Sequence, residues 1–264
     1  MSIERFAALW NRLGALSDPA VVYALIAAAY GEPHRRYHTL EHIGRLLALF
    51  HTVRGRLAAA DAAELALWLH DLVYDPRATD NEEKSAAFAR QTLQAGAVSP
   101  EVAELTAGMI LATKHAAPPE DPDARYVVDV DLSILGAPPE EFDRYEAQIR
   151  EEQSFRPDEE FRQRRAHRLR AFLDRPRIFL TPEFASYEAP ARSNLASSLK
   201  RLGDLDPLPP HPTHNPLTFI LSPPRGRGQG EGGRRRGKGH RLGEGERVVL
   251  QDARRRAITL ADFS

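Results

Sequence analysis

Among the ten histidines of the chain, four lie beside apolar stretches and have a polar companion at helical spacing: His38, His42, His70 and His115. His38 and His42 are four positions apart, so on a continuous helix they project from one face with their Cβ atoms about 5–6 Å apart. Two imidazoles at this spacing can share one site.

The adjacent pair His70-Asp71 is embedded in the apolar run Leu65 to Val73. Burial of an unpaired imidazole and carboxylate is strongly unfavourable, so something must compensate it. Neutral imidazole and carboxylate are ordinary ligands of divalent first-row ions, so a bound metal would compensate the cost of burying the pair. The alternative is a helix end at which Asp71 opens a turn through Tyr74-Asp75-Pro76.

Composition narrows the kind of metal site and the kind of partner. The chain has 264 residues and no cysteine, so a metal must be held by histidine and carboxylate rather than thiolate. Lys and Arg number 36 against 37 Asp and Glu, which gives no bulk charge that favours nucleic acid or membrane. The longest apolar run, Val21 to Tyr30, is too short to span a bilayer, so we expect a cytoplasmic protein.

The elements that must position these residues are expected to be helices. From Ile3 to about Leu205 amphipathic segments alternate with Pro and Gly, which predicts one all-α domain over residues 1–205. Residues 42–51 have the apolar stripe of a half-buried helix, and residues 64–73 are apolar on all sides, which indicates a central buried helix. Further helices are expected over residues 139–152, 158–174 and 189–202. Residues 126–132 alternate apolar and polar, which locally favours a strand.

Residues 206–264 differ from the rest and predict a disordered tail rich in Pro, Gly and Arg. From Pro223 to Arg247 the tail has eight Lys or Arg against three Glu. It could bind RNA phosphates, but no aromatic side chain interleaves the arginines to stack on bases, so a solvated extension is favoured. Gly228, Gly230 and Gly233 match a dinucleotide-binding fingerprint, which is rejected because no helix follows them.

Five motifs in order resemble the HD superfamily of metal-dependent phosphohydrolases. They are Tyr37-His38-Thr-Leu-Glu-His42-Ile, Trp68-Leu-His70-Asp71-Leu-Val-Tyr74-Asp75, Asn81-Glu82-Glu-Lys-Ser85-Ala, Thr113-Lys-His115 and Asp129-Val-Asp131-Leu-Ser-Ile-Leu-Gly136. More narrowly, the chain is similar to a bacterial group of short, uncharacterised predicted HD phosphohydrolases. That similarity extends from about Ile3 to Leu205 and includes Tyr145, Ile149-Arg150-Glu151 and Ala191-Arg192-Ser-Asn194-Leu195. A more distant similarity is to cyclic-nucleotide phosphodiesterases.

The resemblance implies a compact HD-domain helical bundle and a role for each motif residue. The implied ligands of a divalent ion (Mn, Mg, Fe, Ni or Zn) are His42, His70, Asp71 and Asp131. His38 is the implied general acid, and Asp71 can also bridge a second ion or accept a proton. The resemblance also implies that residues 124–135 are helical against their local pattern. It leaves Asp129 as an exposed or capping carboxylate.

Other polar residues near the motifs have two interpretations each. His115 is a candidate ligand of a second metal or a phosphate contact, or a helix-end residue before Pro118-Pro119. Glu82 can orient water or a metal-bound water, or be an exposed cap. Three basic side chains could contact substrate phosphates: Lys114, Arg35 and Arg36. Salt bridges to glutamate neighbours are favoured for Arg150 and Arg192.

The chain departs from the pattern of the resemblance at Phe161-Arg-Gln-Arg-Arg, where a Tyr and a Gly-Arg pair are expected. The function that these features imply is hydrolysis of a phosphoester or phosphoanhydride by metal-activated water. The substrate is expected to be a nucleotide or another small phosphorylated metabolite. The alternative is a non-catalytic metal- or nucleotide-binding regulatory module on the same fold.

Overall fold

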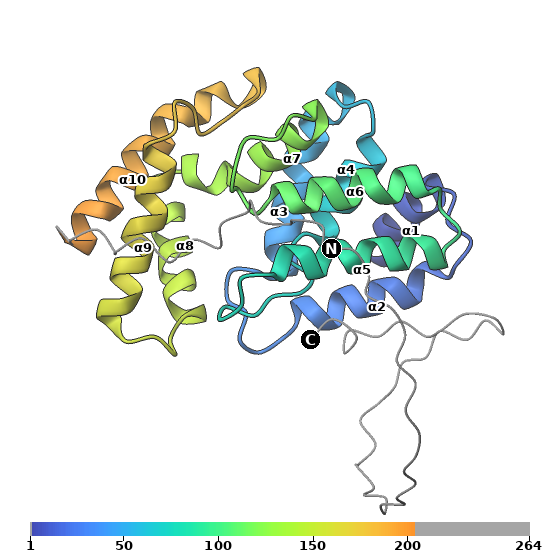
Figure 1. Cartoon of the computed structure of the whole chain (residues 1–264), viewed down its shortest axis with the longest axis horizontal. Coiled ribbons are helices and arrows are strands. Elements are labelled where there is room, and N and C mark those ends of the chain that lie inside the picture. Colours follow the sequence, from blue (N-terminus) through green and yellow to red (C-terminus); the bar gives the residue numbers. More distant parts are fainter. Residues whose placement is uncertain (1, 204–264) are drawn as a thin grey trace, which may run out of the picture.

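The computed structural model describes residues 2–203, which form a bundle of ten α-helices without a strand in that range (Figure 1). The predicted tail over residues 206–264 lies outside the described residues. The helices are α1 (Ile3–Arg12), α2 (Pro19–Tyr30), α3 (Leu40–Val53), α4 (Ala60–Leu69), α5 (Asn81–Ala95), α6 (Pro100–Ala112), α7 (Pro122–Asp131), α8 (Pro139–Glu152), α9 (Asp158–Leu173) and α10 (Glu188–Leu202). Short 3-10 segments follow α3 (η1, Arg54–Arg56) and α7 (η2, Leu132–Gly136) and precede α10 (η3, Pro182–Tyr187).

Helix α4 lies at the centre of the core, as the all-round apolar sequence predicts, but it extends from Ala60 to Leu69 rather than over residues 64–73. Every residue from Ala62 to Leu69 is buried, and the helix packs against α1, α3, α6 and α7. The Trp68 ring meets the Phe6 ring edge to face, at a centroid distance of 5.3 Å. Because α4 ends at Leu69, His70 and Asp71 lie just beyond a rigid, fully packed element.

Helix α3 buries the predicted stripe of Ile43, Leu46, Leu47 and Phe50, and His42 is buried with them. The helix begins at Leu40, so the continuous helix through His38 and His42 is wrong. The backbone N–H groups of the residues before it, 36–38, donate to the buried carboxylate of Glu152 on α8. This tertiary contact holds His38 in a turn outside the helix.

Helix α7 confirms that the segment with the strand-like pattern is helical. Pro122 occupies the first turn, and the Asp121 carboxylate caps the helix by accepting the N–H of Ala124. The expectation of an exposed Asp129 is wrong, because its side chain is fully buried and accepts the backbone N–H groups of Leu180 and Thr181. Packing on several sides of the helix explains why the local apolar and polar alternation is misleading.

Helices α8, α9 and α10 gather at one side of the molecule, on the left in Figure 1. Their bounds agree with the predicted ranges to within one residue. Helix α10 is tied to η2 by the Asn194 amide, which donates to the carbonyl oxygens of Leu135 and Ala137. Arg192 forms the expected salt bridge, with its Nε 2.7 Å from Glu188. Arg150 pairs with Asp158 rather than a glutamate.

Candidate metal centre and its cavity

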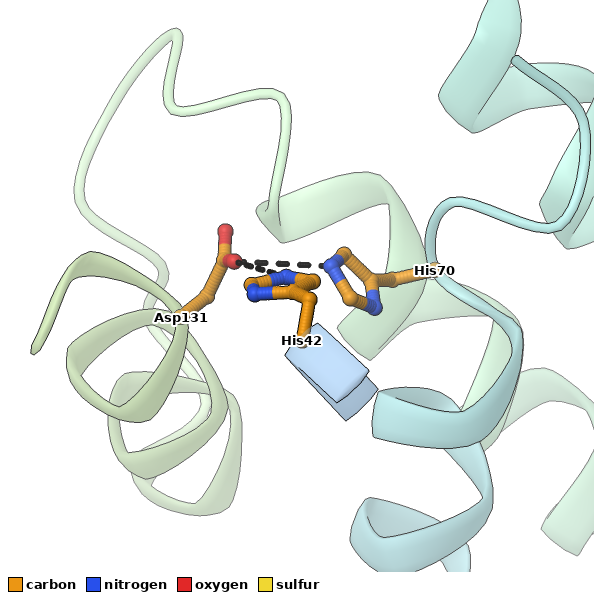
Figure 2. Close-up of side chains that lie close together, drawn as sticks. All are labelled: His42, His70 and Asp131. Carbon is orange, nitrogen blue, oxygen red and sulfur yellow. Dashed lines mark ion pairs between the residues drawn. The ribbon is translucent and has the colours of Figure 1, made fainter. Parts of the chain in front are cut away.

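Three of the four implied metal ligands converge on one point. One ligand atom from each of His42, His70 and Asp131 lies within 4.8 Å of the others (Figure 2). His42 lies in the first turn of α3, His70 follows the end of α4, and Asp131 is the last residue of α7. Asp131 Oδ1 lies 3.8 Å from His42 Nε2 and 3.4 Å from His70 Nε2. This group could hold a metal ion.

The two histidines present buried ring nitrogens to this point. His70 Nδ1 donates to the Leu67 carbonyl at 3.0 Å, which leaves Nε2 to face Asp131. Nε2 of His42 and of His70 are buried. Within residues 2–203, His42 Nε2 has no hydrogen-bond partner, whereas His70 Nε2 lies 2.8 Å from Asp71 Oδ2. A buried polar atom without a partner is costly, and a divalent ion would supply one for His42 and would take the place of the proton on His70. The donor set therefore fits a metal.

Asp71 also contacts the two histidines of this group. Its Oδ2 is 2.8 Å from His70 Nε2, 3.9 Å from His42 Nε2 and 3.8 Å from His38 Nε2. Burial disfavours the charged carboxylate, but the nearby His70 and His38 imidazoles outweigh it and lower the Asp71 pKa. Asp71 is thus a carboxylate placed between the two candidate ligand histidines and His38.

The histidines differ in their protonation. Burial, together with the neighbouring His70, lowers the pKa of His42 to about 3, so His42 is neutral at physiological pH and its free nitrogen can bind a metal. For His70, burial opposes protonation, but the carboxylates of Asp71 and Asp131 outweigh it and raise its pKa well above the usual value. A metal ion that binds His70 must therefore displace a proton.

Sequence reasoning missed Glu152, the last residue of α8, whose buried carboxylate holds His38 in place. Glu152 Oε2 accepts from His38 Nδ1 at 2.7 Å and from the Tyr74 hydroxyl at 2.8 Å. The His38 Nδ1–H therefore points to Glu152, and Nε2 faces Asp71. Burial lowers the His38 pKa, but Asp71 and Glu152 outweigh it, so the net shift is upward. Glu152 follows the motif Ile149-Arg150-Glu151, yet 114 positions separate it from His38.

The basic residues proposed as phosphate contacts have other partners. Arg35 is buried, and its guanidinium donates to the carbonyl oxygens of Asp71 at 2.7 Å and Leu72 at 2.8 Å, so it supports the turn that carries Asp71. Arg36 Nη1 donates to the carbonyl of Pro33. Lys114 Nζ binds the Thr79 carbonyl and the Glu83 carboxylate.

His115 contacts a candidate metal ligand. Its Nε2 lies 2.8 Å from Asp131 Oδ2, and its ring packs against Phe172. The backbone of His115 has a φ of +56°, a left-handed conformation that costs a non-glycine residue about 1–3 kcal/mol. The surrounding fold maintains this conformation and so orients the Asp131 carboxylate. Glu82 is half-buried and lines the cavity described next.

A cavity of about 800 Å³ opens onto the centre. His38, Asp71, His115 and Asp131 form part of its wall, and the rest includes side chains from α8 and α9. Phe161, Arg164 and Arg165, in the segment where the chain departs from the resemblance, also line it. Its volume is in the range of sites for small molecules.

Comparison of the chain with models of protein families, with curated proteins and with solved structures gives no match. Within residues 2–203, no helix has the length and apolar character needed to cross a membrane.

Proposed function

We propose that the protein is a metal-dependent phosphohydrolase that cleaves a phosphoester or phosphoanhydride of a nucleotide or another small phosphorylated metabolite. The observation that carries this proposal is the convergence of two buried imidazole nitrogens, of His42 and His70, on the Asp131 carboxylate, with His42 Nε2 lacking a hydrogen-bond partner among residues 2–203. The centre lies beside a cavity of about 800 Å³ that is lined by His38 and Asp71. The five motifs that resemble the HD superfamily support the same function.

A divalent ion held by His42, His70, Asp131 and the adjacent Asp71 would neutralise charge on phosphoryl oxygens and make a water more acidic. His38 is placed to protonate the leaving oxygen from Nε2, because Glu152 accepts its Nδ1–H and favours the imidazolium. Asp71 lies beside the candidate ligand histidines, and in this proposal its carboxylate accepts a proton from the attacking water. A site that only bound metal would not require the paired His38 and Glu152, which favours the enzyme over a regulatory module.

The test begins with metal binding. The full chain is purified under reducing, chelator-free conditions and incubated separately with Mn²⁺, Mg²⁺, Fe²⁺, Ni²⁺ and Zn²⁺; retained metal is then measured. His42→Ala removes a candidate ligand, and His51→Ala is the matched control because His51 is an exposed histidine at the other end of α3. We expect wild type and His51→Ala to retain metal and His42→Ala to lose it. Wild type that retains none of these ions contradicts the proposal.

The second stage measures phosphate release from nucleotides and other phosphorylated metabolites with the retained ion. We expect His38→Ala to reduce the rate by about 10²–10⁴-fold, the usual contribution of a general acid. His34→Ala is the control, because His34 is also close to Tyr74 but is not among the residues that line the cavity. No release from any compound by the metal-loaded wild type would refute the hydrolase function.

A further inference from the structure

One part of the wall of the cavity beside the candidate metal centre is rich in arginine. Besides the residues of the centre, the cavity is lined by five arginines: Arg77, Arg156, Arg164, Arg165 and Arg168. All but the first lie on α9 or in the turn that precedes it. An arginine side chain is always charged and offers several donors in one plane, which suits phosphoryl oxygens.

Three of these arginines already have a carboxylate partner. Arg156 and Arg164 both contact Glu160, and Arg165 contacts Glu146. Arg77 and Arg168 form no ion pair within residues 2–203. The cavity wall therefore contains guanidinium groups whose charge no described carboxylate balances.

Arg168 has a second unbalanced arginine beside it. The guanidinium carbon of Arg168 lies 5.7 Å from the centroid of the Phe172 ring, and that of Arg175 lies 4.5 Å from the same centroid. Arg175 also has no ion pair in the described part of the chain. Burial, together with the charge of Arg168, lowers the Arg175 pKa. Two like charges around one ring repel each other, and an anion bound to Arg168 would offset that repulsion.

This arginine pair is close to the candidate metal centre. Arg175 donates to the His115 carbonyl, and the ring centroids of Phe172 and His115 are 5.9 Å apart. His115 in turn binds Asp131, a candidate metal ligand, at 2.8 Å. Asp131, His115, Phe172 and Arg168 all line this cavity, so a ligand could contact both Asp131 and Arg168 along one part of its wall.

Two phenylalanine rings in the arginine-rich part of the wall, Phe155 and Phe172, are each in contact with two arginines. Guanidinium carbons lie over the Phe155 ring at 4.0 Å, from Arg77, and at 4.8 Å, from Arg156. The Phe172 ring is flanked in the same way by its own two arginines. These guanidinium groups compete with a nucleobase for contact with the two phenylalanine rings. Recognition by this wall is therefore expected to depend on the anionic groups of a ligand.

We propose that Arg168, with Arg175 beside it, binds a second phosphoryl group of the substrate, at a distance from the group that is cleaved at the metal centre. The substrate class is then a compound with at least two phosphoryl groups. The position of the cleaved group rests on the proposed function. The anion site at Arg168 rests on the cavity alone and can be tested without turnover.

The experiment is calorimetric titration of pyrophosphate into the full chain after chelator treatment, so that no metal contributes to binding. Arg168→Gln removes the charge and keeps a polar side chain. Arg162→Gln is the matched control, because Arg162 is an exposed arginine on the same helix that pairs with Glu159 and does not line the cavity. A charge-assisted hydrogen bond stabilises by about 1.5–3 kcal/mol, which corresponds to a loss of about 10- to 150-fold in affinity.

We expect Arg168→Gln to weaken pyrophosphate binding by that factor and Arg162→Gln to leave it within about twofold of wild type. Equal affinity of wild type and Arg168→Gln, or no binding by wild type, would overturn the anion site while leaving phosphate release by the metal-loaded enzyme untouched. Conversely, binding that depends on Arg168 in a protein that releases phosphate from no compound would support the anion site and refute the proposed function.

Discussion

Glu152→Gln tests the assignment of His38 as an acid, because the substitution keeps the shape of the side chain and removes its charge. In the native structure Glu152 Oε1 accepts three backbone N–H groups, from residues 36–38, at 2.7–3.0 Å. The glutamine oxygen can accept the same three. Its amide nitrogen then faces His38 Nδ1, which loses its acceptor, and the Tyr74 hydroxyl.

The size of the effect follows from the lost interaction. A hydrogen bond between charged groups stabilises by about 1.5–3 kcal/mol, and one pKa unit corresponds to about 1.4 kcal/mol. The pKa of His38 is therefore expected to fall by about 1–2 units in Glu152→Gln. The sign is downward because Glu152 raises the native pKa of His38. At neutral pH the imidazolium fraction, and with it the rate, should fall by up to about 10–100-fold.

The assay follows the His38 resonance by NMR titration of the ¹⁵N-labelled full chain and records the pH profile of phosphate release. Glu151→Gln is the control, since Glu151 is an exposed neighbour that pairs with Arg36. We expect the alkaline limb of the profile to move to lower pH by the same 1–2 units in Glu152→Gln only. An unchanged His38 pKa in this variant would refute the positioning role of Glu152.

Three further predictions concern the metal and the stability of the fold. Because the pKa of His70 is raised, metal binding should release about one proton per ion, and the metal affinity should rise about tenfold per pH unit below that pKa. Calorimetric titration in two buffers of different ionisation enthalpy measures the released proton. A metal affinity that does not depend on pH would contradict this prediction. Arg35→Met leaves the carbonyl oxygens of Asp71 and Leu72, beside the candidate metal centre, without their donor. The free energy of unfolding, measured in urea, should fall by about 2–4 kcal/mol. A loss below about 0.5 kcal/mol would contradict the supporting role of Arg35. Gly136→Ala should destabilise the fold by about 1–3 kcal/mol, because the new Cβ would lie 2.8 Å from Tyr187. Gly108→Ala should stabilise it by about 0.5–1 kcal/mol, because Gly108 lies within α6 with open space around it. A change of the same sign in the melting temperature of both variants would contradict the packing.

The dependence of the free energy of unfolding on pH in the acid range provides a separate test of Glu152. Hydrogen bonds from His38 and from the backbone outweigh burial and lower the pKa of Glu152 to about 2 from its ordinary value of 4.5. A lowered pKa in the folded state contributes stability that is full above about 4.5 and is lost as the pH falls toward 2. The contribution is about 3 kcal/mol at neutral pH. We expect urea unfolding of Glu152→Gln to show a weaker dependence on pH between these values than that of wild type.

Helical class and the bounds of α8, α9 and α10 could be predicted from the sequence because they depend on local signals. The stripe from Ile43 to Phe50, the all-round apolar residues of α4 and the prolines before α8 act over a few turns of chain. Local signals were misleading where tertiary contacts override them. Helix α7 carries a strand-like alternation because it is packed on several sides, and the turn at His38 exists because Glu152 accepts its N–H groups.

The same distinction applies to the candidate site. The absence of cysteine meant that any metal would be held by histidine and carboxylate, but the pair His70-Asp71 alone left a helix-end turn open, and the ligand set came from the resemblance. The ends of α3, α4 and α7 bring His42, His70 and Asp131 to one point, a long-range arrangement that no spacing encodes. Only the packing of α8 and α9 against that point supplies Glu152 behind His38 and the arginine wall of the cavity. Local periodicity reports which face of a helix is buried, whereas the partners across the core depend on how all the helices pack at once.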